Sequence, residues 1–118
     1  MSINTEIRQA LTGYAPLVAH IADRVRLNAA QATDTLPYVV YRTDRKQERG
    51  LGGSLHGEVI TAELQAWAQN PGRCEQIGDM IEVAVAATLP DAMVTDITTG
   101  LDPDTLLDFV SVRVLILR

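Results

Sequence analysis

The sequence is poor in the residues that most often make disulfides, metal sites and catalytic centres. It has one cysteine, Cys74, and two histidines, His20 and His56. A single cysteine cannot form a disulfide within the chain and supplies only one of the four ligands of a structural zinc site. Neither histidine has another potential ligand at a spacing such as H-x-x-x-H. We therefore expect no bound metal and no other cofactor.

Long apolar runs are also missing. No stretch of about 20 apolar residues, the length that crosses a bilayer, occurs in the chain. The first ten residues, MSINTEIRQA, contain an acid and polar groups where a signal peptide would have a basic start and an apolar stretch. We therefore expect a soluble protein that does not act at a membrane.

An excess of basic residues is absent as well. The 15 acidic and 10 basic residues give a net charge of −5, and the isoelectric point is near 4.8. Proteins that bind nucleic acid mainly by neutralising phosphates need a net basic surface. The composition therefore argues against nucleic-acid binding as the main task of this protein.

Hydrophobic residues, by contrast, are plentiful. They make up 47% of the 118 residues, whereas charged residues make up 21%. This composition is sufficient for a hydrophobic core in a chain of this length. We expect one domain that spans residues 1–118.

Apolar residues at helical spacing predict two main helices. The first has Ile3, Ile7, Ala10, Leu11 and Tyr14 at helical spacing, with Ser2 or Asn4 as N-cap and Gly13 as the stop. The second begins after the Asn70-Pro71 cap and continues to Pro90, with an apolar seam formed by Cys74, Ile77, Ile81, Ala84 and Thr88. A shorter apolar stretch, residues 17–21, follows Pro16.

Alternating or β-branched segments predict the strands. They cover residues 24–27, 38–43, 56–68, 94–98 and 106–117. Residues 44–54 are charged and then glycine-rich, which predicts a long hairpin loop between the second and third of these strands. Residues 100–104 are expected to turn. Together the elements predict an α+β fold with a mostly antiparallel sheet of four to five strands, two main helices and a protruding β-hairpin loop.

Motifs that could carry chemistry are incomplete. The glycines of residues 50–53 lack the phosphate-loop spacing and lead into a strand instead of a helix. Asp102, Asp104 and Asp108 do not fit the calcium-loop pattern and are better interpreted as a turn. Cys74 lies on the apolar side of the second helix, where a thiol packs in the core. We expect no catalytic residues.

Charge is uneven in one place. Arg42, Arg45, Lys46 and Arg49, four of the ten basic residues, fall within eight positions. Asp44 and Glu48 lie among them, so a solvated loop and a contact with an acidic partner or phosphates are both consistent with the pattern.

The final strand is the second unusual segment. Its alternate residues are apolar on both faces near its end. Such a strand is either central in the sheet or covered by a subunit interface.

Four segments together give the sequence a family resemblance. They are Ala22-Asp23-Arg24-Val25 after the first helical region, Leu36-Pro37-Tyr38-Val39-Val40-Tyr41, Glu63-Leu64-Gln65-Ala66-Trp67-Ala68, and the helix from Arg73 to Leu89. In order and spacing the chain resembles the tail-completion or tail-terminator proteins of siphophages, prophages and phage-like particles. The resemblance covers about three quarters of the chain and leaves out residues 91–118.

The resemblance implies a structural protein without catalytic activity. Members of this family form a ring, usually a hexamer, that caps the finished tail tube and joins it to the head-side connector. By this resemblance the partners are further copies of the chain, the tail tube protein and the connector or neck protein, and DNA passes through the lumen without specific binding. The expected location is the head-proximal end of the virion tail, after assembly in the host cytoplasm.

The resemblance also places the assembly contacts on the predicted hairpin, residues 42–55. The residues expected to make them are Arg42, Arg45, Lys46, Arg49, Leu51 and Leu55. A glycine-rich loop that orders on assembly fits this role.

Two other functions remain open from the sequence. A small-molecule-binding or enzymatic α+β domain would need converging polar or titratable groups, and the sequence shows none at useful spacing. A nucleic-acid-binding module would use the basic cluster and would bind DNA with strong salt dependence.

Overall fold

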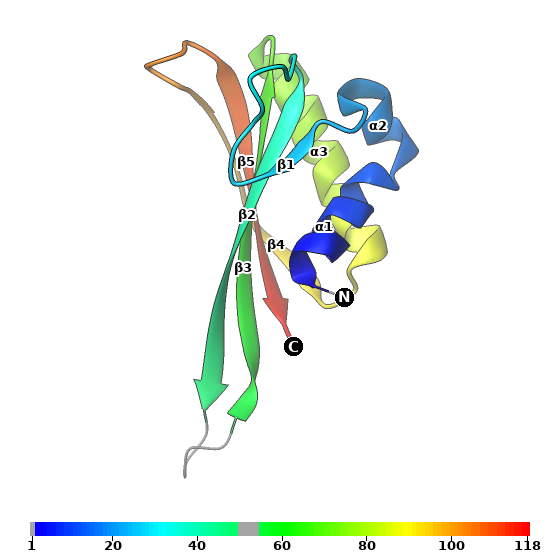
Figure 1. Cartoon of the computed structure of the whole chain (residues 1–118), viewed down its shortest axis with the longest axis vertical. Coiled ribbons are helices and arrows are strands. Elements are labelled where there is room, and N and C mark those ends of the chain that lie inside the picture. Colours follow the sequence, from blue (N-terminus) through cyan, green and yellow to red (C-terminus); the bar gives the residue numbers. More distant parts are fainter. Residues whose placement is uncertain (1, 50–54) are drawn as a thin grey trace.

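The computed structural model describes residues 2–49 and 55–118, and only the backbone of residues 47–49, 55 and 56. Within these ranges the chain forms three helices and five strands (Figure 1). The elements in chain order are α1 (Ile3–Thr12), α2 (Ala15–Ile21), β1 (Val25–Leu27), β2 (Tyr38–Arg49), β3 (Leu55–Ala68), α3 (Pro71–Thr88), β4 (Ala92–Leu101) and β5 (Asp108–Leu117).

The two main helices begin at side chains that cap them. Ser2 Oγ accepts a hydrogen bond from the Thr5 backbone N–H at 3.2 Å, which identifies Ser2 as the N-cap of α1. Asn70 Oδ1 accepts one from the Arg73 N–H at 2.8 Å at the start of α3. Each cap satisfies one of the backbone donors that the first turn of a helix leaves without a partner. The predicted starts of both helices are confirmed.

The five strands form one sheet in the order β1-β2-β3-β5-β4. The pairs β2–β3, β3–β5 and β5–β4 are antiparallel, whereas β1 pairs in parallel with β2. This confirms the α+β class and the mostly antiparallel sheet. All three helices lie on one side of the sheet (Figure 1).

Three details of the sequence prediction were wrong. β2 continues to Arg49, so residues 44–49 are strand where a loop was predicted, and they pair with residues 55–61 of β3. β4 includes residues 100 and 101, which were predicted to turn. Thr88, expected in the apolar seam of α3, is exposed at its last turn.

The physical reason for the longer strands is the same in both. Backbone pairing with a long neighbouring strand satisfies the N–H and C=O groups, and the charged side chains remain in solvent on either face. The tip of the predicted hairpin loop, residues 50–54, lies outside the described residues, so this part stays a prediction.

The core lies between the helices and the sheet. Alternate residues of β3 and β5 point towards the helices and are buried, as the period of two predicts. They are Ile60, Ala62, Leu64, Ala66, Ala68, Val110, Val112, Val114 and Ile116. β5 is therefore a central strand, between β3 and β4.

Polar contacts hold α1 against the sheet. The Tyr41 hydroxyl donates to the Asn4 carbonyl at 3.1 Å, and Thr43 Oγ1 lies 2.8 Å from Asn4 Oδ1. One turn further along α1, the Arg8 guanidinium donates to the Val25 carbonyl of β1. These contacts hold α1 on the same side of the sheet as α2 and α3, and the opposite face of the sheet carries no helix in the described ranges (Figure 1).

Candidate assembly surface

The face of the sheet opposite the helices, here called the open face, carries the residues that alternate with the core positions. Strand register places them in rows that cross β2, β3, β5 and β4. No helix or strand in the described ranges packs on this face (Figure 1), and only residues 28–30, after β1, border a pocket over Tyr38, Val40, Gln65 and Trp67. Because single elements of a small domain bury their apolar faces against a partner, a large uncovered sheet face is a candidate contact surface.

One row of the open face is aromatic. Tyr38 pairs with Trp67, and Trp67 pairs with Phe109 on the next strand. The Trp67 and Phe109 rings have centroids 5.0 Å apart and are tilted by 42°. The neighbouring residue on β4 is Gly100, which leaves room for the Phe109 ring. This end of the open face is therefore an aromatic cluster of half-buried side chains.

A second row alternates in charge. Arg42, Glu63, Arg113 and Asp96 occupy successive strands at one level. Arg42 Nη2 lies 3.3 Å from Glu63 Oε2, and Gln65 Nε2 donates to Glu63 Oε1 at 2.8 Å. The row begins with a positive residue on β2 and ends with a negative residue on β4. Opposite charges on directly paired residues stabilise the sheet.

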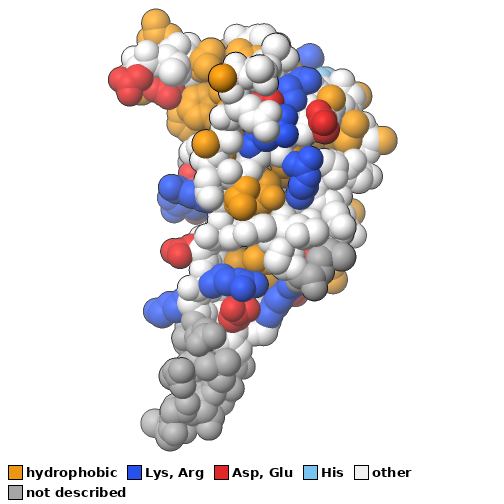
Figure 2. Space-filling model, viewed as in Figure 1, with side chains coloured by type: hydrophobic (Ala, Val, Ile, Leu, Met, Phe, Trp, Pro, Cys, Tyr) orange, Lys and Arg blue, Asp and Glu red, His pale blue; other side chains and the backbone are white. Residues whose placement is uncertain are grey.

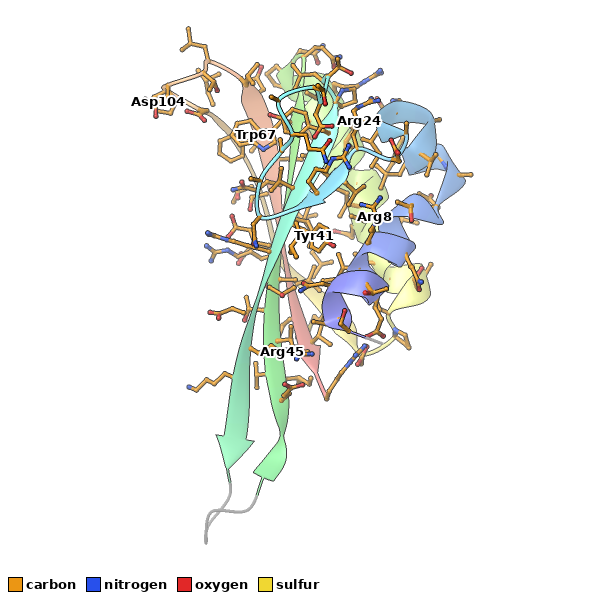
Figure 3. All side chains as sticks on the ribbon, viewed as in Figure 1. Arg8, Arg24, Tyr41, Arg45, Trp67 and Asp104 are labelled. Carbon is orange, nitrogen blue, oxygen red and sulfur yellow. The ribbon has the colours of Figure 1, made fainter. Side chains whose placement is uncertain are left out.

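The basic residues singled out from the sequence lie on β2, beyond the point where β1 ends. β1 pairs only with residues 39–41 of β2. Arg42, Arg45 and Lys46 follow and are exposed. Arg45, labelled in Figure 3, lies 3.7 Å from Glu58 on β3. Figure 2 shows basic and acidic side chains close together along this part of the molecule.

The other predicted contact residues lie at the far end of the same strand pair. Arg49 and Leu55 pair through the backbone at the ends of β2 and β3. Their side chains, and Leu51 as a whole, lie outside the described residues. The structure therefore places the three described basic residues on one strand, and their role in assembly stays a prediction.

Sequence reasoning predicted a strand at residues 94–98 but missed that β4 extends over Ala92–Leu101 and lies at an edge of the sheet. Three of its large hydrophobic residues are exposed: Met93 by 57%, Ile97 by 39% and Leu101 by 55%. The strand contains no lysine or proline, which are the residues that commonly prevent pairing at a sheet edge. A signal was present, because residues 92–101 are β-branched and apolar with a single charge, but its position at an edge depends on strand order.

An ion-pair network around Arg118 lies on the helix side of the sheet. Arg118 Nη2 donates to Glu6 Oε1 at 2.8 Å, and Arg118 Nε donates to Asp91 Oδ2 at 2.8 Å. These bonds from Arg118 lower the pKa of Glu6 and of Asp91 below their ordinary values. The network joins α1, the turn before β4 and the end of β5.

A similar pair orders the connection between β1 and β2. Asp34 accepts two bonds from the Arg26 guanidinium and one from the Gln31 N–H, which together lower the pKa of Asp34. Both networks link structural elements. Neither gathers groups that face a substrate.

Cys74 and the Asp102–Asp104 turn lie where the sequence analysis placed them. Cys74 is buried on α3, and burial raises the pKa of its thiol. Asp102 Oδ1 accepts from the Asp104 N–H at 2.8 Å in a turn. Across residues 2–49 and 55–118, no three potential metal ligands gather. None of the described helices is long and apolar enough to span a membrane.

Solved structures include a chain with the same fold. A chain of the virion of a native gene transfer agent particle superposes with a TM-score of 0.72 at 14% sequence identity. The match covers 98% of the present chain and 93% of that chain. Comparison with curated protein sequences gives no match.

Comparison with protein families gives a match over almost the whole length. The model of the family described as tail completion protein gp17 matches residues 5–117. It includes β4 and β5, the region for which the four segments of the sequence resemblance gave no information. The chain therefore belongs to the tail completion protein gp17 family, and its role is a structural one in tail assembly.

Proposed function

We propose that this chain forms a ring, a hexamer, that terminates the tail tube of a phage or phage-like particle and joins it to the head-side connector. The observation that carries the proposal is the family match over residues 5–117. In this proposal the chain acts as a single domain and catalyses no reaction. Its place is the head-proximal end of the tail, and assembly occurs in the host cytoplasm.

The shape of the sheet supports a role in assembly. An uncovered face and exposed edge strands give the chain two kinds of surface that neighbouring subunits can use. A ring requires heterologous contacts, in which one surface of a subunit binds a different surface of the next. β1 and β4 lie at opposite edges of the sheet, so the chain has two distinct edges.

The distribution of charge supports the proposed partners. Arg42, Arg45 and Lys46 on β2, with Arg49, Leu51 and Leu55 further along the chain, would make the assembly contacts, which include further copies of the chain, the tail tube protein and the connector. The net charge of −5 fits a lumen through which DNA passes without binding. The basic cluster on β2 then serves a protein contact and not a DNA site.

The experiment that tests the proposal is a mass measurement on the full chain. We would measure the mass by light scattering for the protein alone and after mixing with the tail tube protein of the same particle. Negative-stain imaging would then show rings or caps on tube ends. We expect a ring of six copies, or a cap at one end of each tube.

A pair of variants addresses the contact residues. The variant Lys46→Glu reverses one exposed charge on β2, and Glu82→Arg reverses one on the exposed side of α3 as a matched control. We expect the first to lose tube capping and the second to retain it. A wild-type protein that stays monomeric with the tube protein present would overturn the proposed ring.

A further inference from the structure

We infer that the ring closes by edge-to-edge strand pairing, in which β4 of one copy adds to the free edge of β2 in the next copy. The partner is thus a second copy of this chain, and the inference rests on the proposed ring. It names the two surfaces that meet, Ala92–Asp96 on β4 and Arg42–Arg45 on β2. The argument uses strand direction, edge chemistry and charge.

The directions of the strands allow β4 of one copy to pair antiparallel with β2 of the next copy. β2 is antiparallel to β3, β3 to β5, and β5 to β4. β4 therefore runs opposite to β2 of its own chain, and also opposite to β2 of a copy in the same orientation. Placing copies side by side continues the antiparallel alternation without a break. Antiparallel pairing satisfies the N–H and C=O groups of both edges.

The edge of β2 is available only over part of its length. β1 covers residues 39–41 and ends at Leu27, and within the described ranges no strand pairs with that side of β2 from Arg42 onward. On β4, the extra residue Thr95 interrupts the pairing with β5 between Val94 and Asp96. Such a bulge bends a strand locally. The bulge lies near the boundary between residues 92–96, which would pair with β2 of the next copy, and residues 97–101, which would run past β1 of that copy.

The chemistry of the β4 edge favours a partner. Met93 is 57% exposed, and the neighbouring large hydrophobics Ile97 and Leu101 are also exposed on this strand. Natural edge strands that remain in solvent are usually blocked by lysine, proline or covering segments. Residues 92–94 precede the bulge and contain no charged residue and no proline, so this part of the β4 edge is suited to pairing with another strand.

Charge gives the register. The row Arg42–Glu63–Arg113–Asp96 has positive, negative, positive and negative residues on successive strands at one level. Adding the next copy at the same level places Asp96 beside its Arg42. The alternation of charge then continues through the contact, and a shift by one position would put the two residues on opposite faces.

Charge-reversal variants test the contact. Arg42→Glu and Asp96→Lys each place like charges at the contact, whereas the double variant restores opposite charges there. We expect each single variant to fall from a ring to smaller species under conditions where the wild type is fully assembled. The double variant should recover the ring, as measured by native mass spectrometry.

A matched pair of lysine variants tests the edge. Met93→Lys puts a charge at the β4 edge, and Val83→Lys puts one at a similarly exposed position, 49%, on α3. We expect the first to prevent the ring and the second to leave it intact. Circular dichroism of each variant checks that the monomer remains folded.

Amide hydrogen exchange distinguishes strand pairing from other contacts. In the ring, the amides of residues 92–96 and 42–45 that point away from their own sheet should exchange at least tenfold more slowly than in the monomer. A wild-type ring without this protection, or one that survives in Met93→Lys and in both single charge variants, would overturn the edge pairing and leave the proposed function intact. A wild type that never forms a ring would overturn both.

Discussion

Gly78 on α3 lies directly against Val110 on β5, so that a Cβ at position 78 would be 2.8 Å from Val110 Cγ2. Both residues are buried between the helix and the sheet. The missing side chain allows α3 to approach the centre of the sheet. Gly100 on β4 lies equally close to the Phe109 ring on β5.

Gly78→Ala should destabilise the protein by up to about 2 kcal/mol, because adding a group to a filled core usually costs about 1–3 kcal/mol. Alanine gains helix propensity of about 1 kcal/mol over glycine, so the overlap has to exceed this gain. Urea denaturation of both proteins measures the difference. Gly72→Ala in the first turn of α3 is the control, because its Cβ would be 3.5 Å from the nearest atom, Asn70 Oδ1. A Gly78→Ala protein as stable as the control would show that α3 can move away from Val110.

Gly100→Ala should cost less than Gly78→Ala, although its Cβ would also be 2.8 Å from the nearest atom, Phe109 Cζ. Phe109 lies on the open face and is only half-buried, so its ring can move towards solvent. We expect a loss below about 1 kcal/mol, the range of one aromatic pair contact. Near-ultraviolet circular dichroism should change because the ring shifts relative to Trp67. Equal losses for the two variants would contradict this distinction.

Asn70→Ala should weaken α3 at its start. The side chain accepts a hydrogen bond from the Arg73 N–H at 2.8 Å, and its loss leaves that donor without the cap. The expected decrease in the free energy of unfolding is about 1 kcal/mol. Asn70→Asp retains an acceptor and should lose much less, as measured by thermal denaturation. Similar losses in both variants would mean that the amide group of Asn70 has another role.

The Arg118 network should make stability depend on pH. Arg118 lowers the pKa of Glu6 and Asp91 in the folded protein, so the folded state binds fewer protons at these sites than the unfolded state. Their contribution is therefore fully present above the unfolded carboxyl values of about 4 and is lost as the pH falls through the folded values.

The variant Arg118→Ala measures this contribution. We expect it to be less stable than the wild type at about pH 7, and the gap to narrow as both proteins are titrated towards pH 3. Each pair is partly exposed, so the effect should stay within the range of about 0.2–1 kcal/mol per ion pair. Arg8→Ala is the control, because the Arg8 guanidinium donates to the Val25 carbonyl and not to a carboxylate. A gap that is constant with pH would indicate lost packing in place of lost ion pairing.

Local sequence was sufficient for most of the elements. Ser2, Asn70 and Pro71 set the helix starts because capping depends on neighbours in the chain. The alternation in β3 and β5 identified the buried face because side chains of a strand alternate with a period of two. The family resemblance likewise came from short segments in a particular order.

Strand ends could not be derived in this way. Residues 44–49 are charged, and only pairing with β3 makes them a strand. The same holds for the end of β4, which pairs with β5 as far as Leu101. In both cases the backbone of a distant segment supplies the hydrogen bonds that local composition does not indicate.

What the sequence by itself determined is the set of helices and strands, the α+β class and the absence of a net basic surface, because these depend on composition and short-range periodicity. Only the tertiary structure decided that β4 is an edge strand, that no strand in the described ranges pairs with the β1 side of β2 from Arg42 onward, and that Arg42, Glu63, Arg113 and Asp96 form one row. These relations join residues that are far apart in the chain. They depend on strand order and register, which are fixed by how the whole sheet packs against the helices.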